Sequence, residues 1–151
     1  MNSIVTSSED ITLVTLQNCP SSIVFGAKIF SSIAEHGVNV DMISQAPSHG
    51  DLSDLSFTIN DEDMGKILTI ISALKDQTEI KASVSSGNCK INVYDDKMKD
   101  TPGVAAKVFT AAAGLNTDIR VITTSDVDIS ILVTQADFQE TLAAIEAAVN
   151  H

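Results

Sequence analysis

This 151-residue chain carries the same order of sequence patterns twice. Lys28-Ile29-Phe30 returns 79 residues later as Lys107-Val108-Phe109, and Val38-Asn39-Val40-Asp41 returns as Leu115-Asn116-Thr117-Asp118. Both copies read strand, helix, strand, strand, helix. A period this long indicates duplication of a whole domain rather than a solenoid of short repeats. We therefore predict two small units built to one plan.

The clearest copy of the plan is the stretch 115–133, which predicts a hairpin. Apolar residues alternate with polar ones through Val127, Ile129, Ile131 and Val133, the pattern of a half-buried strand. The four residues from Thr123 to Asp126 are short and polar, as in a turn. Ser125 and Asp126 are therefore either part of a solvated turn or candidates for ligand contact.

The N-terminal unit is predicted to span residues 7–84. It begins after a break at residues 7–10, with a strand over 11–16, a turn at Asn18-Cys19-Pro20-Ser21 and a helix from Ser22 to Glu35. Strands follow over 38–44 and 52–59, then a helix with an acidic first turn at 61–63 and a closing strand over 79–84.

The C-terminal unit is predicted to comprise residues 85–151 plus 1–6. A strand over 89–94 precedes a helix that Asp100 or Thr101 should cap, with Pro102 in its first turn. Asp137 should open the last helix. This unit lacks a closing strand, whereas Ile4-Val5 at the start of the chain has no place. We expect that segment to cross over and complete the second sheet.

Charge and motifs exclude several functions. The net charge is −11 and Lys and Arg number only nine, which argues against binding nucleic acid or an anionic membrane. The two cysteines are far apart, and there is no export signal or membrane-spanning run, so we expect a cytoplasmic protein with reduced thiols. No phosphate-binding, dinucleotide or nucleophile-elbow motif is present, and the three histidines are not at metal-ligand spacing. We expect no enzymatic activity and no metal site.

Three stretches resemble the tandem ACT region of aspartokinases: VNVDMISQ, MKDTPGVAAKVF and ITTSDVDISILV. The resemblance covers nearly the whole chain. It implies an α+β fold of two ferredoxin-like βαββαβ units, with the leading strand lent to the second unit. It also implies a regulatory role, in which lysine, threonine or both bind between ACT units and lower the activity of a kinase domain that phosphorylates aspartate. That domain, which would use ATP and magnesium, is absent here, so we expect no cofactor in this chain.

An amino-acid effector needs donors for its carboxylate and acceptors for its ammonium, and a helix N-terminus supplies the donors. The family pattern implies one site joining the loop Asp100, Thr101, Pro102, Gly103 and Val104 to Asn39, Val40, Asp41 and Met42. It implies a second site joining Asn18, Cys19, Pro20 and Ser21 to Asn116, Thr117, Asp118 and Ile119, with Gln45 nearby.

The first loop departs from the family. Relatives often read Asp-x-Pro-Gly where this chain has Asn18-Cys19-Pro20-Ser21, and Arg120 stands where relatives often carry an acid. An arginine facing the pocket would disfavour a cationic effector. We therefore favour the loop at Asp100, although that loop could be only a helix cap, and Asp41 and Asp118 could be only solvent-facing strand residues.

Two other functions remain open. The chain could be a free-standing ACT sensor without its own kinase, or a structural dimerisation module. In each case sheet edges and apolar helix faces favour association, as a homodimer, with an aspartokinase catalytic domain, or both.

Overall fold

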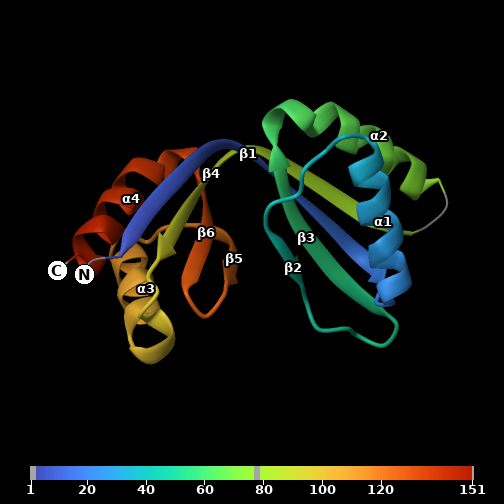
Figure 1. The fold of residues 1–151 in the computed structure, drawn as a ribbon. Coiled ribbons are helices and arrows are strands. Elements are labelled where there is room, and N and C mark those ends of the chain that lie inside the picture. The colour runs from blue at the N-terminus through green and yellow to red at the C-terminus, as the bar shows by residue number, and fades with distance from the viewer. Residues whose placement is uncertain (1–2, 77–78, 151) are drawn as a thin grey trace. The chain divides into compact units, whose positions relative to one another are not determined.

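The computed structural model describes residues 3–76 and 79–150. Residues 1–2, 77–78 and 151, which fall inside the predicted units, lie outside this description. The order of the described elements (Figure 1) is β1 (Ile4–Pro20), α1 (Ile23–Glu35), β2 (Ile43–Gln45), β3 (Leu52–Asn60), η1 (Asp61–Asp63), α2 (Met64–Lys75), β4 (Lys81–Tyr94), η2 (Met98–Asp100), α3 (Val104–Gly114), β5 (Ile119–Thr124), β6 (Asp128–Thr134) and α4 (Gln135–Val149).

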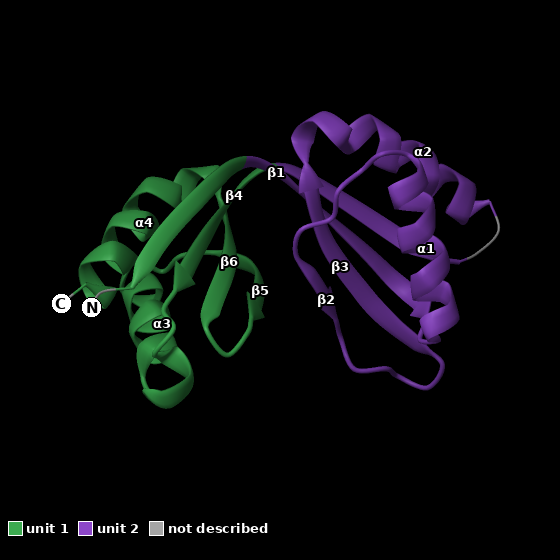
Figure 2. Ribbon diagram, in the orientation of Figure 1, with its two compact units in different colours: residues 1–9, 87–151 green, residues 10–86 purple. Residues whose placement is uncertain are grey.

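The chain forms two compact units (Figure 2). Unit 1 comprises residues 1–9 and 87–151, and unit 2 comprises residues 10–86. The strand order is β2-β3-β1-β4-β6-β5, and the long strands β1 and β4 each contribute one part to either unit. Each unit therefore has the strand, helix, strand, strand, helix, strand plan. The predicted α+β fold is confirmed, including the N-terminal strand that completes the sheet of unit 1.

The predicted break at residues 7–10 is wrong, because β1 continues through it. β4 likewise continues through residues 85–87, where the second unit was predicted to begin. Both segments are polar, and β1 and β4 are hydrogen-bonded neighbours in the sheet. Asp10 has a φ of 59° and Gly87 a φ of 72°, and each is the first residue after a unit boundary. In each of the two long strands, the boundary between the units thus coincides with a residue of positive φ.

In unit 2, two helices cover one face of the sheet. Inward-facing side chains alternate along the strands, as a pleated strand requires, and Val14, Leu16, Leu55, Phe57 and Ile59 meet Ile29, Ile33, Ile67 and Ile71 from the helices. Phe30 and Phe57 pack edge to face with ring centroids 5.6 Å apart. Ser22, which was predicted as the first helical residue, is instead the N-cap of α1, because its Oγ accepts from the Val24 amide at 3.0 Å.

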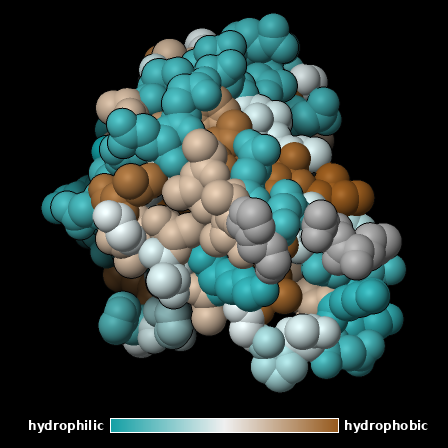
Figure 3. All heavy atoms as spheres, turned by 90° about the vertical axis from the view of Figure 1, so that its left-hand side faces the viewer, coloured by the Kyte–Doolittle hydropathy of each residue, from teal (hydrophilic) through white to brown (hydrophobic). Residues whose placement is uncertain are grey.

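In unit 1, the predicted hairpin is present as β5 and β6, with Thr124 opposite Ile129. Alternating residues of β4 and β6 form a core with α3 and α4: Cys89, Ile91, Val93, Ile129, Ile131, Val133, Val108, Phe138 and Ile145. Val5 from the N-terminal strand packs against this core, as expected of a closing strand. In Figure 3, hydrophilic residues surround an area of weakly to strongly hydrophobic residues that gather in the middle of the face shown.

The strand predicted over 38–44 is mostly absent, because β2 covers only Ile43–Gln45. The preceding residues still follow β3: the Asp41 amide donates to the Thr58 carbonyl, and the Thr58 amide to the Met42 carbonyl, both at 3.0 Å. None of the helices in the described residues is long and apolar enough to cross a membrane.

Candidate functional site

The loop predicted at Asn18–Ser21 is mainly the end of β1. The register between β1 and β3 shifts between Leu16 and Cys19, and Asn18 adopts a φ of 63°. This bulge inserts extra residues into the strand, which is why turn-forming residues occur there without ending it. The Asn18 amide donates to Asp54 Oδ1 at 3.3 Å, and the chain leaves the sheet at Ser21.

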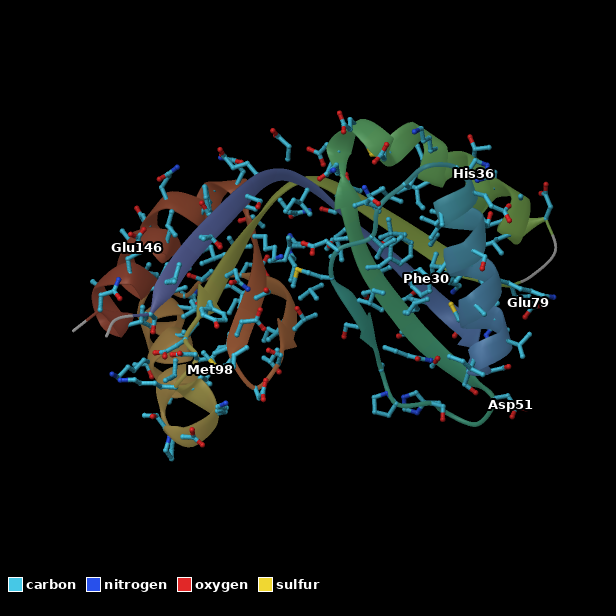
Figure 4. The ribbon with its side chains drawn as sticks, in the orientation of Figure 1. Phe30, His36, Asp51, Glu79, Met98 and Glu146 are labelled. Carbon is cyan, nitrogen blue, oxygen red and sulfur yellow. The ribbon has the colours of Figure 1, made fainter. Side chains whose placement is uncertain are left out.

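A pocket of about 620 Å³ opens beside the start of α1. Four residues of the predicted second site line it: Cys19, Pro20, Ser21 and Gln45. The remaining wall is mostly apolar and comes from α1, β2 and β3: Ile23, Phe25, Ala27, Phe30, Ala34, Ile43 and Leu55, with Phe30 labelled in Figure 4. Among the described residues, no charged side chain lines this pocket. A neutral group of a ligand can therefore enter the pocket without burying a charged side chain of the lining.

Two polar groups of this pocket have assigned partners. Gln45 Nε2 donates to Ser53 Oγ at 3.0 Å, which orients the side-chain amide. Cys19 is 1% exposed, and its Sγ donates to the Leu16 carbonyl at 3.4 Å. Burial, and then the nearby Asp54 carboxylate, raises the pKa of the Cys19 thiol to about 11. Cys19 is therefore a neutral wall of the pocket rather than a nucleophile.

The predicted partners at residues 39–42 lie in unit 2 as well. Asn39, Val40 and Asp41 line a hollow of about 250 Å³. Met42 is buried, and its amide donates to Thr58 Oγ1 at 2.9 Å. Met42 therefore packs inside the unit, whereas the three residues before it offer an accessible polar edge.

In unit 1, the loop at Asp100–Val104 is built differently from the prediction. Asp100 ends η2, Thr101 follows it in an extended conformation, and α3 begins at Val104 with Gly103 as its N-cap. No side chain caps α3, so the prediction of a cap at Asp100 or Thr101 is wrong. The short η2 turn uses these residues, and a positive φ of 101° at Gly103 then starts the helix. The Asp100 and Thr101 side chains are exposed.

Asp95 holds the beginning of that loop. Its Oδ1 accepts from the Lys97 amide and its Oδ2 accepts from the Ser3 hydroxyl, both at 2.9 Å. These hydrogen bonds, first that of the Lys97 amide and then that of Ser3, lower the pKa of Asp95 below its ordinary value. The N-terminal segment thus ties down the loop that leads to α3.

The residues at 116–119 connect α3 to β5. Asn116 has a φ of 54°, and the Thr117 hydroxyl lies 2.7 Å from that of Thr141 on α4. Asp118 Oδ2 and Arg120 Nε form an ion pair at 3.1 Å, and both side chains are substantially exposed. Arg120 is thus partly neutralised by its own neighbour. Ile119 is half-buried against the core of unit 1.

Ser125 serves the hairpin turn. Its Oγ donates to Asp128 Oδ1 at 2.7 Å and accepts from the amides of Val127 and Asp128, both at 3.2 Å. Its hydroxyl is therefore occupied by the turn, and Asp126 beside it is exposed.

The structure brings Pro20, Ser21 and Gln45 together in one pocket, and Asn39, Val40 and Asp41 in one hollow. The pairing of the 100–104 loop with residues 39–42, and of the Asn18 loop with residues 116–119, stays a prediction. The apolar wall of the larger pocket was missed. Ile23 belongs to the apolar stripe that predicts the first helix and Ile43 to a predicted strand, so both were interpreted as core residues, whereas they are 85% and 50% exposed.

Two segments of the chain match the sequence model of one known protein family. A sequence model of the family described as ACT domain matches residues 18–74 and again residues 91–149. Aspartokinase from Bacillus sp. (strain MGA3) is 27% identical over 145 residues, which make up 95% of this chain and 35% of that protein. The chain spans about a third of the length of the curated relatives it matches.

Solved structures agree with the sequence comparison. The ligand-free regulatory subunit of aspartate kinase from Thermus thermophilus matches with a TM-score of 0.87 and 26% identity, and the match covers 95% of both chains. E. coli aspartokinase III in complex with lysine and aspartate matches with a TM-score of 0.75 over 96% of this chain and 32% of that one. At 19% identity, this second match shows a shared fold.

Proposed function

The chain belongs to the ACT domain family, as a tandem pair, and we propose that it is the regulatory part of an aspartokinase that binds threonine, lysine or both. The observation that carries this proposal is the match to the Thermus thermophilus regulatory subunit, because it covers 95% of both chains. The proposed role is allosteric: the effector favours one conformation of the ACT pair, and the same free energy of coupling acts on the kinase.

The reaction itself would belong to a separate catalytic part. We propose that this part transfers phosphate from ATP, with magnesium, to aspartate, and that the present chain holds no cofactor of its own. The buried, protonated Cys19 supports a binding role rather than a nucleophilic one. We place the protein in the cytoplasm, where cysteines that form no disulfide, such as Cys19 and Cys89, are stable.

The pocket beside α1 supports threonine as its effector. Its wall offers hydroxyls, a side-chain amide and apolar surface, and its described lining contains no carboxylate for the second ammonium that lysine carries on its side chain. The α-ammonium, which both amino acids share, would need a charged acceptor from outside this lining. Lysine, which the matched E. coli protein carries in its complex, would need an acid from elsewhere, such as Asp100 or Asp41. The two amino acids are therefore expected to depend on different residues.

Association follows from exposed apolar surface. Ile43 lies on β2, at the edge of the strand order, and Ile23 and Leu52 nearby are also substantially exposed. Exposed apolar residues beside an open strand edge are typical of an interface. We propose that the chain works as a homodimer, with the catalytic part, or both.

Calorimetric titration of the intact chain with threonine and with lysine tests the proposal. Asp100→Ala should weaken binding of an effector that uses this carboxylate by about 1.5 to 3 kcal/mol, as for a lost hydrogen bond to a charged group. Asp96→Ala, on the same loop but outside the predicted site, is the matched control. Gln45→Ala should weaken threonine binding by about 0.5 to 1.5 kcal/mol, with Gln139→Ala as control.

Absence of heat with both amino acids, together with an unchanged melting temperature, would rule out effector binding by this chain. The remaining roles would then be the structural dimerisation module or a sensor for another metabolite.

A further inference from the structure

A second groove of unit 2 lies between α1 and α2 and contains none of the predicted effector residues. Its volume is about 380 Å³. Ile29 and Ile70, which are 3% and 5% exposed, form its floor, and Phe25 and Leu74 are half-buried beside them. These side chains already belong to the core, so the base of the groove is held by packing.

One edge of the groove is polar and comes from α1 and its C-cap residue His36. Lys28, Ser32 and His36 follow each other at intervals of four residues, which places them one above the other on the helix, about 6 Å apart per step. Figure 4 shows His36 at the end of α1 nearest α2. The edge therefore runs the length of the groove.

The polar edge carries positive charge without an acid. Within the described residues, Lys28 makes no ion pair, and no carboxylate lines the groove. Glu35, on the same helix, lines a neighbouring hollow that Lys28 and Ser32 also line, but Glu35 does not line the groove itself. In a chain with a net charge of −11, a cation at an apolar groove whose lining contains no carboxylate is complementary to an anion.

The hydroxyls and the imidazole define where that anion can bind. The His36 Nδ1–H donates to the Ser32 carbonyl at 2.7 Å, because a carbonyl only accepts, and the Thr69 hydroxyl donates to the Gly65 carbonyl at 3.2 Å. The Ser32 hydroxyl has no such partner among the described residues. The donors left for a ligand are therefore the Lys28 ammonium and the Ser32 hydroxyl, one turn apart.

We propose that the groove between α1 and α2 binds a small monocarboxylate with an apolar aliphatic or aromatic tail. The carboxylate lies between Lys28 and Ser32, and the tail covers Ile29, Ile70 and Leu74. The volume is at the lower end of the range for small-molecule sites. An amino acid is a poorer ligand than the matching acid, because the groove has no carboxylate for its ammonium. This site is thus separate from the proposed effector sites.

Chemical-shift titration of the isotope-labelled intact chain with 3-phenylpropionate tests the proposal. The acid should shift amides of residues 25–36 and 69–74 and bind about threefold to fivefold more tightly than 3-phenylpropionamide, which has the same tail without the charge. Acetate, which has the charge without the tail, should cause no saturable shift there. Equal affinity for acid and amide, or shifts centred on other residues, would overturn the proposal.

Four variants complete the test. Lys28→Gln should bring the acid down to the affinity of the amide, whereas Lys75→Gln, which removes a lysine of α2 that does not line the groove, should leave the difference intact. Ala73→Phe should fill the groove and abolish binding, and Ser72→Phe places the same ring on the adjacent exposed position as a control for folding. Binding that survives both Lys28→Gln and Ala73→Phe would contradict the assignment, whatever the outcome with threonine and lysine.

Discussion

Gly103 and Gly114 stand at the two ends of α3, and replacing each by alanine should change stability in opposite directions. Gly103 has a φ of 101°, a conformation that L-residues rarely adopt, whereas Gly114 has no positive φ and lies within the last turn of the helix. Neither glycine has an atom within 4 Å of where a Cβ would stand. Overlap of the new Cβ with surrounding residues therefore contributes to neither change in stability, and both changes are set by the backbone conformation of the substituted residue.

The magnitudes follow from the backbone conformation. A left-handed conformation costs an L-residue about 1 to 2 kcal/mol, and φ at Gly103 lies beyond the left-handed minimum, so the cost is at the upper end. Alanine loses less conformational entropy on folding than glycine, which returns about 0.4 to 1 kcal/mol. Gly103→Ala should therefore destabilise unit 1 by about 1 to 2 kcal/mol, and Gly114→Ala should stabilise it by about 0.5 to 1 kcal/mol.

Urea unfolding followed by circular dichroism measures both changes, and amide hydrogen exchange of α3 assigns them to unit 1. Equal stability of Gly103→Ala and the unsubstituted chain, or a change of the same sign in both variants, would show that φ at residue 103 does not govern the start of α3.

Three further outcomes are expected. Because folding raises the pKa of the Cys19 thiol from 9.0 to about 11, the protonated thiol contributes fully to stability below pH 9, and this contribution is lost as pH rises towards 11. Urea unfolding at several pH values should show the loss, and the Cys19→Ala variant should not show it. Ser3→Ala should move the pKa of Asp95 up towards its ordinary value in an NMR titration of that carboxyl, and an unmoved pKa would assign the shift wholly to the backbone. Thr141→Val should cost about 1 to 2 kcal/mol in urea unfolding, because Thr141 is buried and its hydroxyl is paired with that of Thr117; a double variant with Thr117→Val should cost less than the sum of the two single changes.

The fold was predictable where apolar residues alternate. Ile129, Ile131 and Val133 are buried in one core because their period of two places them on one face of β6. The crossing of the N-terminal strand followed from counting strands in each copy of the repeat. The continuity of β1 through residues 7–10 was not predictable from local sequence, because the pairing partner of these polar residues is β4, about 80 residues away.

The candidate site was predictable only in its polar half. Pro20, Ser21 and Gln45 were identified from the motif and meet in one pocket. The wall formed by Ile23, Ala27, Phe30 and Ala34 is the helical stripe that predicts α1, and such a stripe indicates core packing. Asp100 and Thr101 are residue types that cap helices, so the pattern favoured them over Gly103. The short η2 turn that uses them has no clear sequence signal, because a three-residue helix is too short to show a period.

The rate of aspartate phosphorylation, measured with the aspartate kinase catalytic part from the same source in the presence and absence of this chain, tests the central claim most directly. We expect the chain to make that rate fall with increasing threonine or lysine, and the fall to require the same residues that support binding in the calorimetric titration. A rate that responds to neither amino acid when the chain is present and bound would contradict a regulatory role.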